Sequence, residues 1–263
     1  MRALTFGFSP CPNDTFAFHA LVHGLVTAPF EVHAILLDIE ELNRRAHDGA
    51  FDLTKLSVGA FAAVGDRYRL LRSGAALGHG VGPLVVAREP RSLIDAVGGR
   101  VAIPGRETTA FRLLRLAAPT LGEVVELRYD QILGAVARGD ADAGLIIHES
   151  RFTYPDHGLV KVVDLGAWWE GETGLPVPLA GICARADLEP ALAAAAEAAI
   201  RASVAYAFAH PEASRPYVRA HSQEMSDEVC DAHIRLYVNA LSLDIGDEGL
   251  RAVARLAGTT LSG

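Results

Sequence analysis

An internal repeat of alternating strands and helices limits the possible folds of this chain more than any other feature of its sequence. Each copy reads strand, turn, helix, strand, helix, strand, and each has a Gly-x-x-Asp segment before its third strand, at 49–52 and at 139–142. The first turns of the two copies also correspond, at 8–16 and 103–111. Such a repeat predicts two similar α/β halves.

Hydrophobic periodicity predicts the positions of the individual elements. In the first copy we expect strands at 4–8, 30–37, 51–57, 68–73 and 81–87, and helices at 15–22, 39–47 and 58–64. In the second copy we expect strands at 100–103, 124–129 and 143–147, and helices at 108–116 and 131–137. From Leu188 onward the chain is expected to be helical, with an alanine-rich helix to about Ala209, a helix capped by Ser226 and a last helix at 247–256.

Strands that alternate with helices form parallel sheets with right-handed crossovers. Two such lobes facing each other describe a Venus-flytrap, as in the type II periplasmic binding proteins. Because 178–185 resembles 83–88, we interpret these two segments as the crossing strands of a hinge. The expected division is 1–87 with 180–263 as lobe one and 88–179 as lobe two, with a ligand cleft between them.

The composition narrows the classes of partner. A net charge of −8 without a Lys/Arg cluster argues against nucleic acid and an anionic membrane surface, but a small anionic ligand needs only a local positive site. Three widely spaced cysteines predict neither a disulfide framework nor structural zinc, and they favour a reducing compartment. The N-terminus does not read as a secretory segment and no apolar stretch reads as a membrane span, so we expect a cytoplasmic protein. The oligomeric state is not predicted.

The most prominent candidate for chemistry is a histidine after a buried strand. The apolar run 145–147 stops at His148 and Glu149, and the carboxyl ends of strands are where open α/β sheets present functional groups. Taken alone, such a histidine could merely cap a loop. The repeat places it opposite the equivalent strand of the other lobe, so we favour a general base.

Two further segments can hold a ligand. Lys55 and Ser57, with Leu56 between them, end a strand, and their side chains share one face and can reach one ligand, although a solvated lysine is the alternative. Thr108, Thr109 and Ala110 place backbone N–H groups and two hydroxyls at a helix start. That arrangement suits a carboxylate, although Thr108 could equally be the N-cap alone.

The turn at 9–14 is the third polar segment. Its two prolines predict an irregular turn, with Asn13 or Asp14 capping the following helix. Asn13 and Asp14 could bind a ligand hydroxyl or orient a base, or they could only start the helix. Ser9, in the same loop, is a second-tier candidate beside them. His19 and His23 lie four residues apart but lack the glutamate of a zinc-binding H-E-x-x-H motif, so no metal site is expected.

Together these motifs resemble the 1,4-dihydroxy-6-naphthoate synthases, enzymes of the futalosine route to menaquinone. The resemblance covers nearly the whole chain and is carried by Ser-Pro-Cys-Pro-Asn-Asp-Thr-Phe at 9–16, Thr-Lys-Leu-Ser at 54–57, Gly-Val-Gly-Pro-Leu-Val at 80–85, Ile-Pro-Gly-Arg-x-Thr-Thr-Ala at 103–110 and Leu-Ile-Ile-His-Glu at 145–149. The first of these motifs is the most specific.

The resemblance implies a type II binding-protein fold and conversion of cyclic dehypoxanthinylfutalosine, a carboxylated small molecule, to 1,4-dihydroxy-6-naphthoate without metal or redox cofactor. Carried over, His148 would be the proton acceptor, and Lys55, Leu56, Ser57, Thr109 and Ala110 would hold the substrate. Two alternatives remain: a sibling enzyme similar to chorismate dehydratase, which the turn at 9–14 disfavours, and a non-catalytic solute-binding protein.

Overall fold

The computed structural model describes residues 2–222 and 226–258 and contains two compact units. Unit 1 comprises Met1–Gly78 and Pro178–Gly263, and unit 2 comprises His79–Val177. The boundaries differ from those expected at 87 and 180. Strand β6 (Leu84–Ala87) pairs with β9 (Ala143–Ile146) and with β10 (Val160–Asp164), so its hydrogen bonds place it in the sheet of unit 2 and not in lobe one.

The sheet of unit 1 has the strand order β2-β1-β3-β11-β4, and β5 also pairs with β11. Strands β1 and β2 and strands β1 and β3 are parallel, whereas β11 runs antiparallel to both β3 and β4. The strands are β1 (Arg2–Phe8), β2 (Phe30–Leu36), β3 (Leu53–Ser57), β4 (Tyr68–Leu70), β5 (Ala76–Gly78) and β11 (Val177–Arg185). Of the two expected hinge strands, at 83–88 and 178–185, this sheet therefore contains only the second, as β11.

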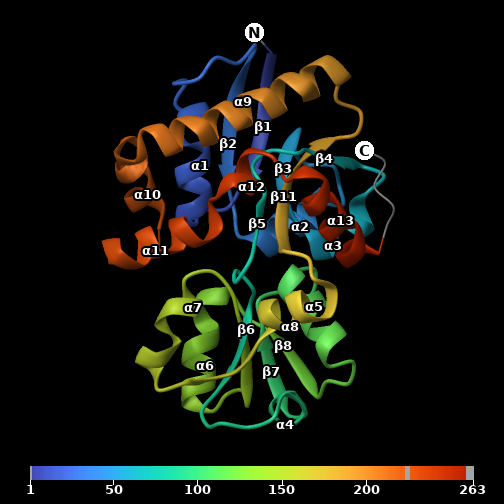
Figure 1. Ribbon diagram of the computed structural model, residues 1–263, viewed down its shortest axis with the longest axis vertical. Coiled ribbons are helices and arrows are strands. Elements are labelled where there is room, and N and C mark those ends of the chain that lie inside the picture. The colour runs from blue at the N-terminus through green and yellow to red at the C-terminus, as the bar shows by residue number, and fades with distance from the viewer. Residues whose placement is uncertain (1, 223–225, 259–263) are drawn as a thin grey trace. The chain divides into compact units, whose positions relative to one another are not determined.

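Helices cover both faces of this sheet (Figure 1). They are α1 (Pro12–Val22), α2 (Ile39–Ala46), α3 (Val58–Val64), α9 (Pro190–Ala209), α10 (Arg215–His221), α11 (Asp227–Tyr237), α12 (Ala240–Leu243) and α13 (Gly246–Ala257), with a 3-10 turn η3 (Pro211–Ser214). Helix α1 packs against α9, and α3 packs against α13. Sequence periodicity predicted α9, α11 and α13 but neither α10 nor α12, which are short.

Unit 2 holds a five-stranded sheet of order β10-β6-β9-β7-β8. Strands β7 (Arg100–Ile103), β8 (Glu123–Glu126) and β9 are mutually parallel. Strand β6 runs antiparallel to its two neighbours, β9 and β10. The helices are α4 (Leu93–Val97), α5 (Thr109–Ala117), α6 (Ile132–Arg138), α7 (Ser150–Thr153) and α8 (Leu165–Thr173), with 3-10 turns η1 (Tyr129–Gln131) and η2 (Tyr154–His157). Helix α8 lies in a segment for which the sequence predicted no helix.

The two Gly-x-x-Asp segments have the same structural role in both units. Asp52 precedes β3, and one of its carboxylate oxygens accepts the backbone N–H of Thr5 in β1 at 2.9 Å. Asp142 precedes β9, and one of its carboxylate oxygens accepts the backbone N–H of Arg100 in β7 at 2.8 Å. Both glycines have positive φ, 66° at Gly49 and 86° at Gly139, which glycine adopts without steric cost. In each unit this aspartate therefore ties the start of the third strand of the repeat, β3 or β9, to the first strand, β1 or β7.

Helix α1 begins earlier than expected. Cys11 is the N-cap, Pro12 is the first helical residue, and Asn13 and Asp14 lie in the first turn. The prediction that Asn13 or Asp14 caps a helix starting at 15 is therefore wrong. Proline suits the first helical position because it has no N–H group to leave unsatisfied there. The early start places the Asn13 and Asp14 side chains on the helix itself.

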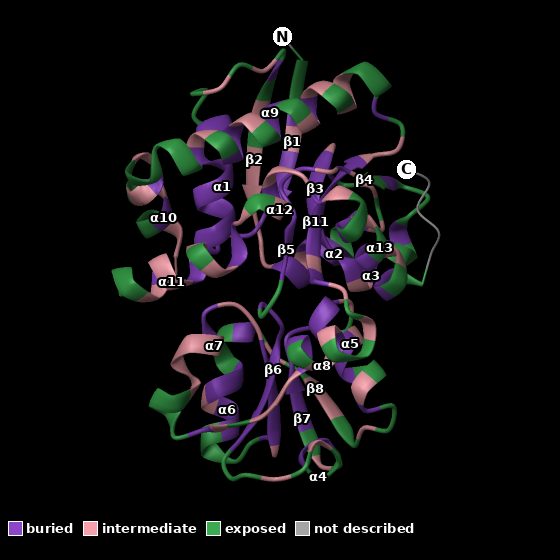
Figure 2. Cartoon of the chain, in the orientation of Figure 1, coloured by how far each residue is buried: buried purple, intermediate pink, exposed green. Residues whose placement is uncertain are grey.

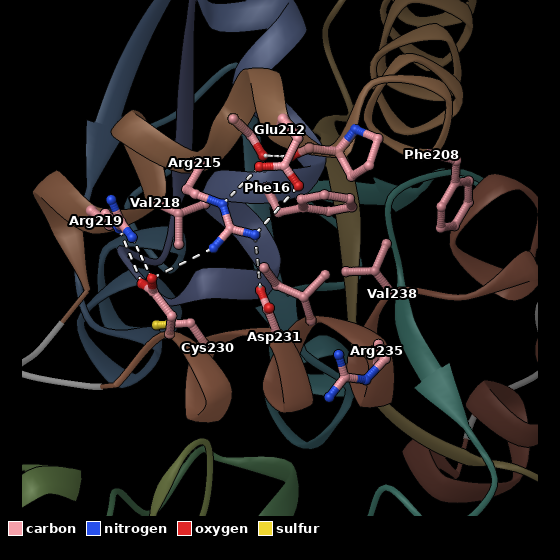
Figure 3. A pocket seen from close by; sticks show the side chains of 14 residues that line it. Phe16, Phe208, Glu212, Arg215, Val218, Arg219, Cys230, Asp231, Arg235 and Val238 are labelled. Carbon is pink, nitrogen blue, oxygen red and sulfur yellow. Dashed lines mark hydrogen bonds and ion pairs between the residues drawn. The ribbon is translucent and has the colours of Figure 1, made fainter.

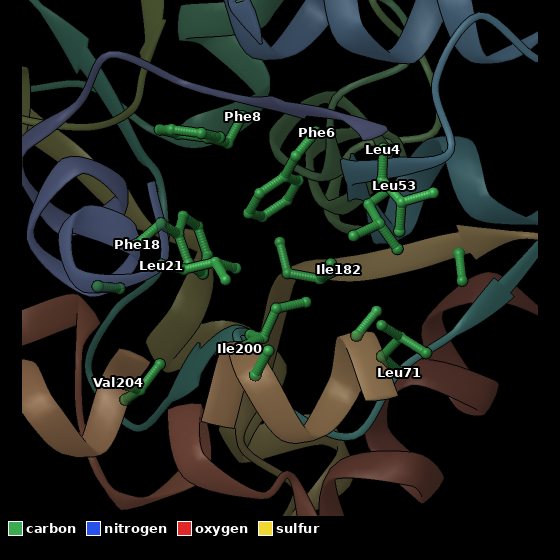
Figure 4. Close-up of a cluster of buried hydrophobic side chains, with 14 of the residues drawn as sticks. Leu4, Phe6, Phe8, Phe18, Leu21, Leu53, Leu71, Ile182, Ile200 and Val204 are labelled. Carbon is green, nitrogen blue, oxygen red and sulfur yellow. The ribbon is translucent and has the colours of Figure 1, made fainter. Parts of the chain in front are cut away.

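The core of unit 1 fills the space between β1, α1 and α9 (Figure 4). Phe6 and Phe8 lie on the same face of β1, and their ring centroids are 5.0 Å and 5.3 Å from that of Phe18 on α1. All three rings are fully buried, which stabilises the fold by roughly 1.5–3 kcal/mol each. Figure 2 shows that the central strands, such as β3 in unit 1 and β9 in unit 2, are buried, whereas β2 and β8 at the sheet edges are mostly intermediate or exposed.

Helix α9 is long and apolar enough to cross a membrane by length and composition, with a mean hydropathy of 1.3, contrary to the expectation that no apolar stretch reads as a membrane span. Its hydroxyl group at Ser203 is completely buried, donates to the carbonyl of Ala17 at 2.7 Å and accepts the N–H of Leu21 at 3.1 Å. Ala196, Ala199, Ile200, Val204 and Ala207 belong to the core described above. One face of α9 is thus buried in the core of unit 1, where the helix packs against α1.

Candidate active site

His148 lies in the turn between β9 and α7. Its φ is 54°, and it is the one non-glycine residue with positive φ in the described ranges 2–222 and 226–258. A side chain in this left-handed region costs roughly 1–2 kcal/mol, and such residues cluster at functional sites. Strand β9 ends at Ile146, one residue earlier than predicted, so His148 belongs to the turn. The backbone at His148 supports the functional interpretation of this residue.

Tyr129 packs against the imidazole of His148. The two ring centroids are 4.9 Å apart and the ring planes meet at 70°, an edge-to-face arrangement. Tyr129 is 7% exposed and also hydrogen-bonds Glu149. The expected strand at 124–129 ends at Glu126, and Tyr129 instead begins η1. Tyr129 therefore restrains the imidazole, and the sequence did not predict this role.

Glu149 is a buried carboxyl group next to His148. Burial raises the pKa of Glu149 above its usual value, and hydrogen bonds from the backbone of Glu149 and from Tyr129 oppose that rise only in part. One carboxylate oxygen, Oε2, has no hydrogen-bond partner among the described residues. In the folded state Glu149 therefore holds its proton to a higher pH than in the unfolded chain.

We expect Glu149→Gln to stabilise the protein more at pH 8 than at pH 4. The native pKa of Glu149 is raised, so wild-type stability falls as pH climbs from the unfolded value through the folded one, and a neutral amide removes this loss. Thermal unfolding checks it, since each kcal/mol moves Tm by about 2–4 °C in a protein of this size. Glu172→Gln, at an exposed position of α8, is the control. An equal Tm difference at both pH values would contradict the prediction.

Thr108 has the simpler of its two expected roles, that of a helix N-cap. The Thr108 hydroxyl accepts the N–H of Phe111 at 3.2 Å and donates to the carbonyl of Gly105 at 2.8 Å, so it serves as the N-cap of α5. Thr109 and Ala110 follow as the first two helical residues, and both are buried. Amides of a first turn have no acceptor within their helix, so these two remain the predicted substrate-binding positions of unit 2.

In unit 1 the predicted residues of 9–14 and of β3 form one buried polar network. The ammonium group of Lys55 contacts the Asp14 carboxylate, and both side chains are about 95% buried. The other Asp14 oxygen accepts the hydroxyl of Ser9 at 2.6 Å and its N–H at 3.1 Å. The amide of Asn13 donates to Asp14 at 2.8 Å. The structure thus brings Ser9, Asn13, Asp14 and Lys55 together, and the alternative of a solvated lysine is wrong.

Ser57 and Leu56 have different surroundings from Lys55. The Ser57 hydroxyl accepts the amide of Asn43 at 3.0 Å, and its N–H donates to the same side chain at 2.9 Å. This bond leaves the hydroxyl proton of Ser57 available as a donor. The Leu56 side chain is 1% exposed, and alternation along β3 places it on the opposite face from Lys55. Asn43, completely buried in α2, is a supporting residue that the sequence did not indicate.

A pocket of about 300 Å³ in unit 1 lies apart from these residues (Figure 3). Its walls come from α1, α9, η3, α10 and α11, and none of the predicted site residues lines it among those the structure describes. Arg215 crosses it and pairs with Glu212, Asp227 and Asp231, so its charge is already matched. In the described ranges, no group of three or more His, Cys, Asp or Glu side chains is placed to hold a metal ion.

Comparison with known proteins connects this geometry to a family. A family model described as "Menaquinone biosynthesis" matches residues 4–260. The chain is 62% identical to a 1,4-dihydroxy-6-naphthoate synthase of Thermus thermophilus, over 97% of this chain and 93% of that protein. It is 47% identical to the enzyme of the same name from Streptomyces coelicolor, over 96% of this chain and 91% of that protein.

Solved structures agree on the fold. A crystal structure of an Archaeoglobus fulgidus protein has a TM-score of 0.92 and 36% identity, covering 97% of this chain and 96% of that chain. A ligand-binding component of an import system from Staphylococcus aureus and sulfonate-binding proteins from Escherichia coli and Xanthomonas axonopodis match with TM-scores of 0.61 to 0.71 at 12% to 17% identity, which shows the fold alone. The predicted type II binding-protein fold is confirmed. With 62% identity across nearly its whole length, the chain belongs to the menaquinone biosynthesis family, among the 1,4-dihydroxy-6-naphthoate synthases.

Proposed function

We propose that His148 is the general base with which this chain converts cyclic dehypoxanthinylfutalosine to 1,4-dihydroxy-6-naphthoate. The left-handed backbone of this residue is the observation that carries the proposal, because a fold retains such strain at a non-glycine residue where the site requires it. Tyr129 supports the proposal, since its ring restrains the imidazole edge-on. An imidazole can accept a proton near neutral pH, as base catalysis in a cell requires.

In this proposal the base removes a proton, the sugar-derived fragment leaves, and the remaining bicycle becomes aromatic. Lys55, Leu56 and Ser57 of unit 1 and Thr109 and Ala110 of unit 2 hold the substrate. The first turn of α5 offers backbone N–H groups suited to a carboxylate. Lys55 and Asp14 offer one donor and one acceptor group side by side, which suits the hydroxyl groups of a sugar-derived ring.

The proposed partner is thus a carboxylated small molecule that the protein binds in the cytoplasm. Neither nucleic acid nor a membrane is proposed as a partner. The net charge of −8 supports this, because nucleic acid and anionic lipid surfaces attract basic proteins. The three cysteines also support it, since all are buried and none forms a disulfide, as in proteins of reducing compartments.

Incubation of the purified protein with cyclic dehypoxanthinylfutalosine tests the function, with naphthoate followed by absorbance and by mass. The expected result is stoichiometric product without added metal or redox cofactor. Tight binding without product would favour a solute-binding protein, and conversion of chorismate instead would favour the sibling enzyme. Either outcome would contradict the proposal.

A further inference from the structure

His233 is a buried polar residue for which the reaction described above has no use. It lies on α11 and is completely buried, and its Nε2 is 2.9 Å from the side-chain oxygen of Asn13 on α1. Asn13 in turn donates to Asp14, which contacts Lys55. A continuous chain of buried polar contacts therefore runs from α11 through α1 to the middle of β3.

The donor and acceptor groups of Asp14, Asn13 and His233 fix the direction of each hydrogen bond between them. A carboxylate only accepts, so the NH2 group of Asn13 must face Asp14, and its carbonyl oxygen must face His233. Because that oxygen also only accepts, Nε2 of His233 must carry a proton. His233 is therefore required here as a donor, and an apolar side chain of similar size would leave the Asn13 oxygen buried and unsatisfied.

We infer that His233 is a positioning residue that acts through Asn13 and Asp14 to hold the Lys55 ammonium group where it meets substrate. This inference rests on the proposed substrate-binding role of Lys55. Without the bond from His233, the Asn13 amide is free to rotate, and the Asp14 carboxylate loses one of the donors that fix it opposite Lys55. A shift of about 1 Å in a binding group can cost on the order of 100-fold in activity.

The sequence offers an unusually clean spectroscopic probe for this inference. It contains 22 arginines but only two lysines, Lys55 and Lys161. Lys55 is 4% exposed, whereas Lys161 is an exposed residue of β10. Lysine-selective 15N labelling therefore gives two Nζ signals, one from the buried pair and one from solvent, and the second is an internal control.

The test compares His233→Leu with His233→Gln, because glutamine can place an N–H donor close to the position of Nε2. In His233→Leu we expect the Lys55 Nζ signal to shift or broaden while that of Lys161 stays unchanged. We expect KM to rise on the order of 10-fold with kcat nearly constant, since a binding interaction is weakened. His233→Gln should keep the wild-type Lys55 signal and most of the wild-type KM.

A purely structural role for His233 gives a different pattern. His233→Leu would then lower Tm and the active fraction, and so apparent kcat, while KM and the Lys55 signal remained unchanged in the folded protein. That pattern would overturn the inference, as would equal impairment of the Leu and Gln variants. Failure of the wild type to turn over the substrate would instead contradict the proposed function, and the NMR comparison does not depend on turnover.

Discussion

Replacing His148 by asparagine is expected to lower kcat by about 10²- to 10⁴-fold, the usual contribution of a general base. Asparagine is the appropriate substitution because, among non-glycine residues, it tolerates a φ of 54° well and cannot accept a proton near neutral pH. The fold at the turn should therefore persist while the chemistry is lost. Single-turnover kinetics with cyclic dehypoxanthinylfutalosine measures the effect.

Substrate binding by this variant should remain largely intact, because the proposed binding groups lie on other elements. Calorimetric titration of His148→Asn and of His148→Ala measures it. His157→Asn, which changes an exposed histidine of unit 2, is the control and should have wild-type kinetics. Near-normal turnover in either His148 variant would remove this residue from the proposed role.

The second large effect is expected at the buried pair of Lys55 and Asp14. Lys55→Met leaves the Asp14 carboxylate buried without its counter-ion. Asp14→Asn likewise leaves the Lys55 ammonium group buried without its counter-ion. Each single substitution should lower the free energy of unfolding by roughly 3–5 kcal/mol. The double variant should recover most of this loss, because removing both charges together is often close to neutral.

Activity should not follow stability in this series. We expect all three variants to have a strongly lowered kcat/KM, since the double variant restores the fold but not the ammonium group that binds substrate. Urea unfolding gives the stabilities, and Lys161→Met, at the other lysine, should change them by less than about 0.5 kcal/mol. Additive stability losses would show that the two charges are not coupled, and a double variant with normal kcat/KM would exclude Lys55 from substrate binding.

Much of the fold could be predicted because the repeat consists of patterns between residues that are close in the sequence. Alternating apolar residues and the two Gly-x-x-Asp segments indicated β1, β3, β7 and β9, and both aspartates bond the neighbouring strand in the same way. The assignment of β6 failed because an apolar strand of four residues fits either sheet, and only its antiparallel partners decide between them.

The candidate site could be predicted only where its residues follow strands or turns. Ser9 and His148 follow strands, Asp14 follows the turn at 9–11, and Lys55 lies near the end of β3. The contact between Asn13 and His233 joins residues 220 positions apart, and no local pattern indicates it. The alternation of Val125, Leu127 and Tyr129 with charged residues favours a strand through 129, although the chain turns into η1 first.

The backbone at His148 places folding and catalysis in opposition at a single position. Glycine adopts a φ of 54° freely, so the unmutated protein carries a steric penalty that glycine would remove. A library selected only for heat resistance should accordingly enrich glycine at 148, whereas one selected for product formation should keep histidine. Redesign guided by stability alone would thus discard the proposed base of this enzyme unless residue 148 is held fixed.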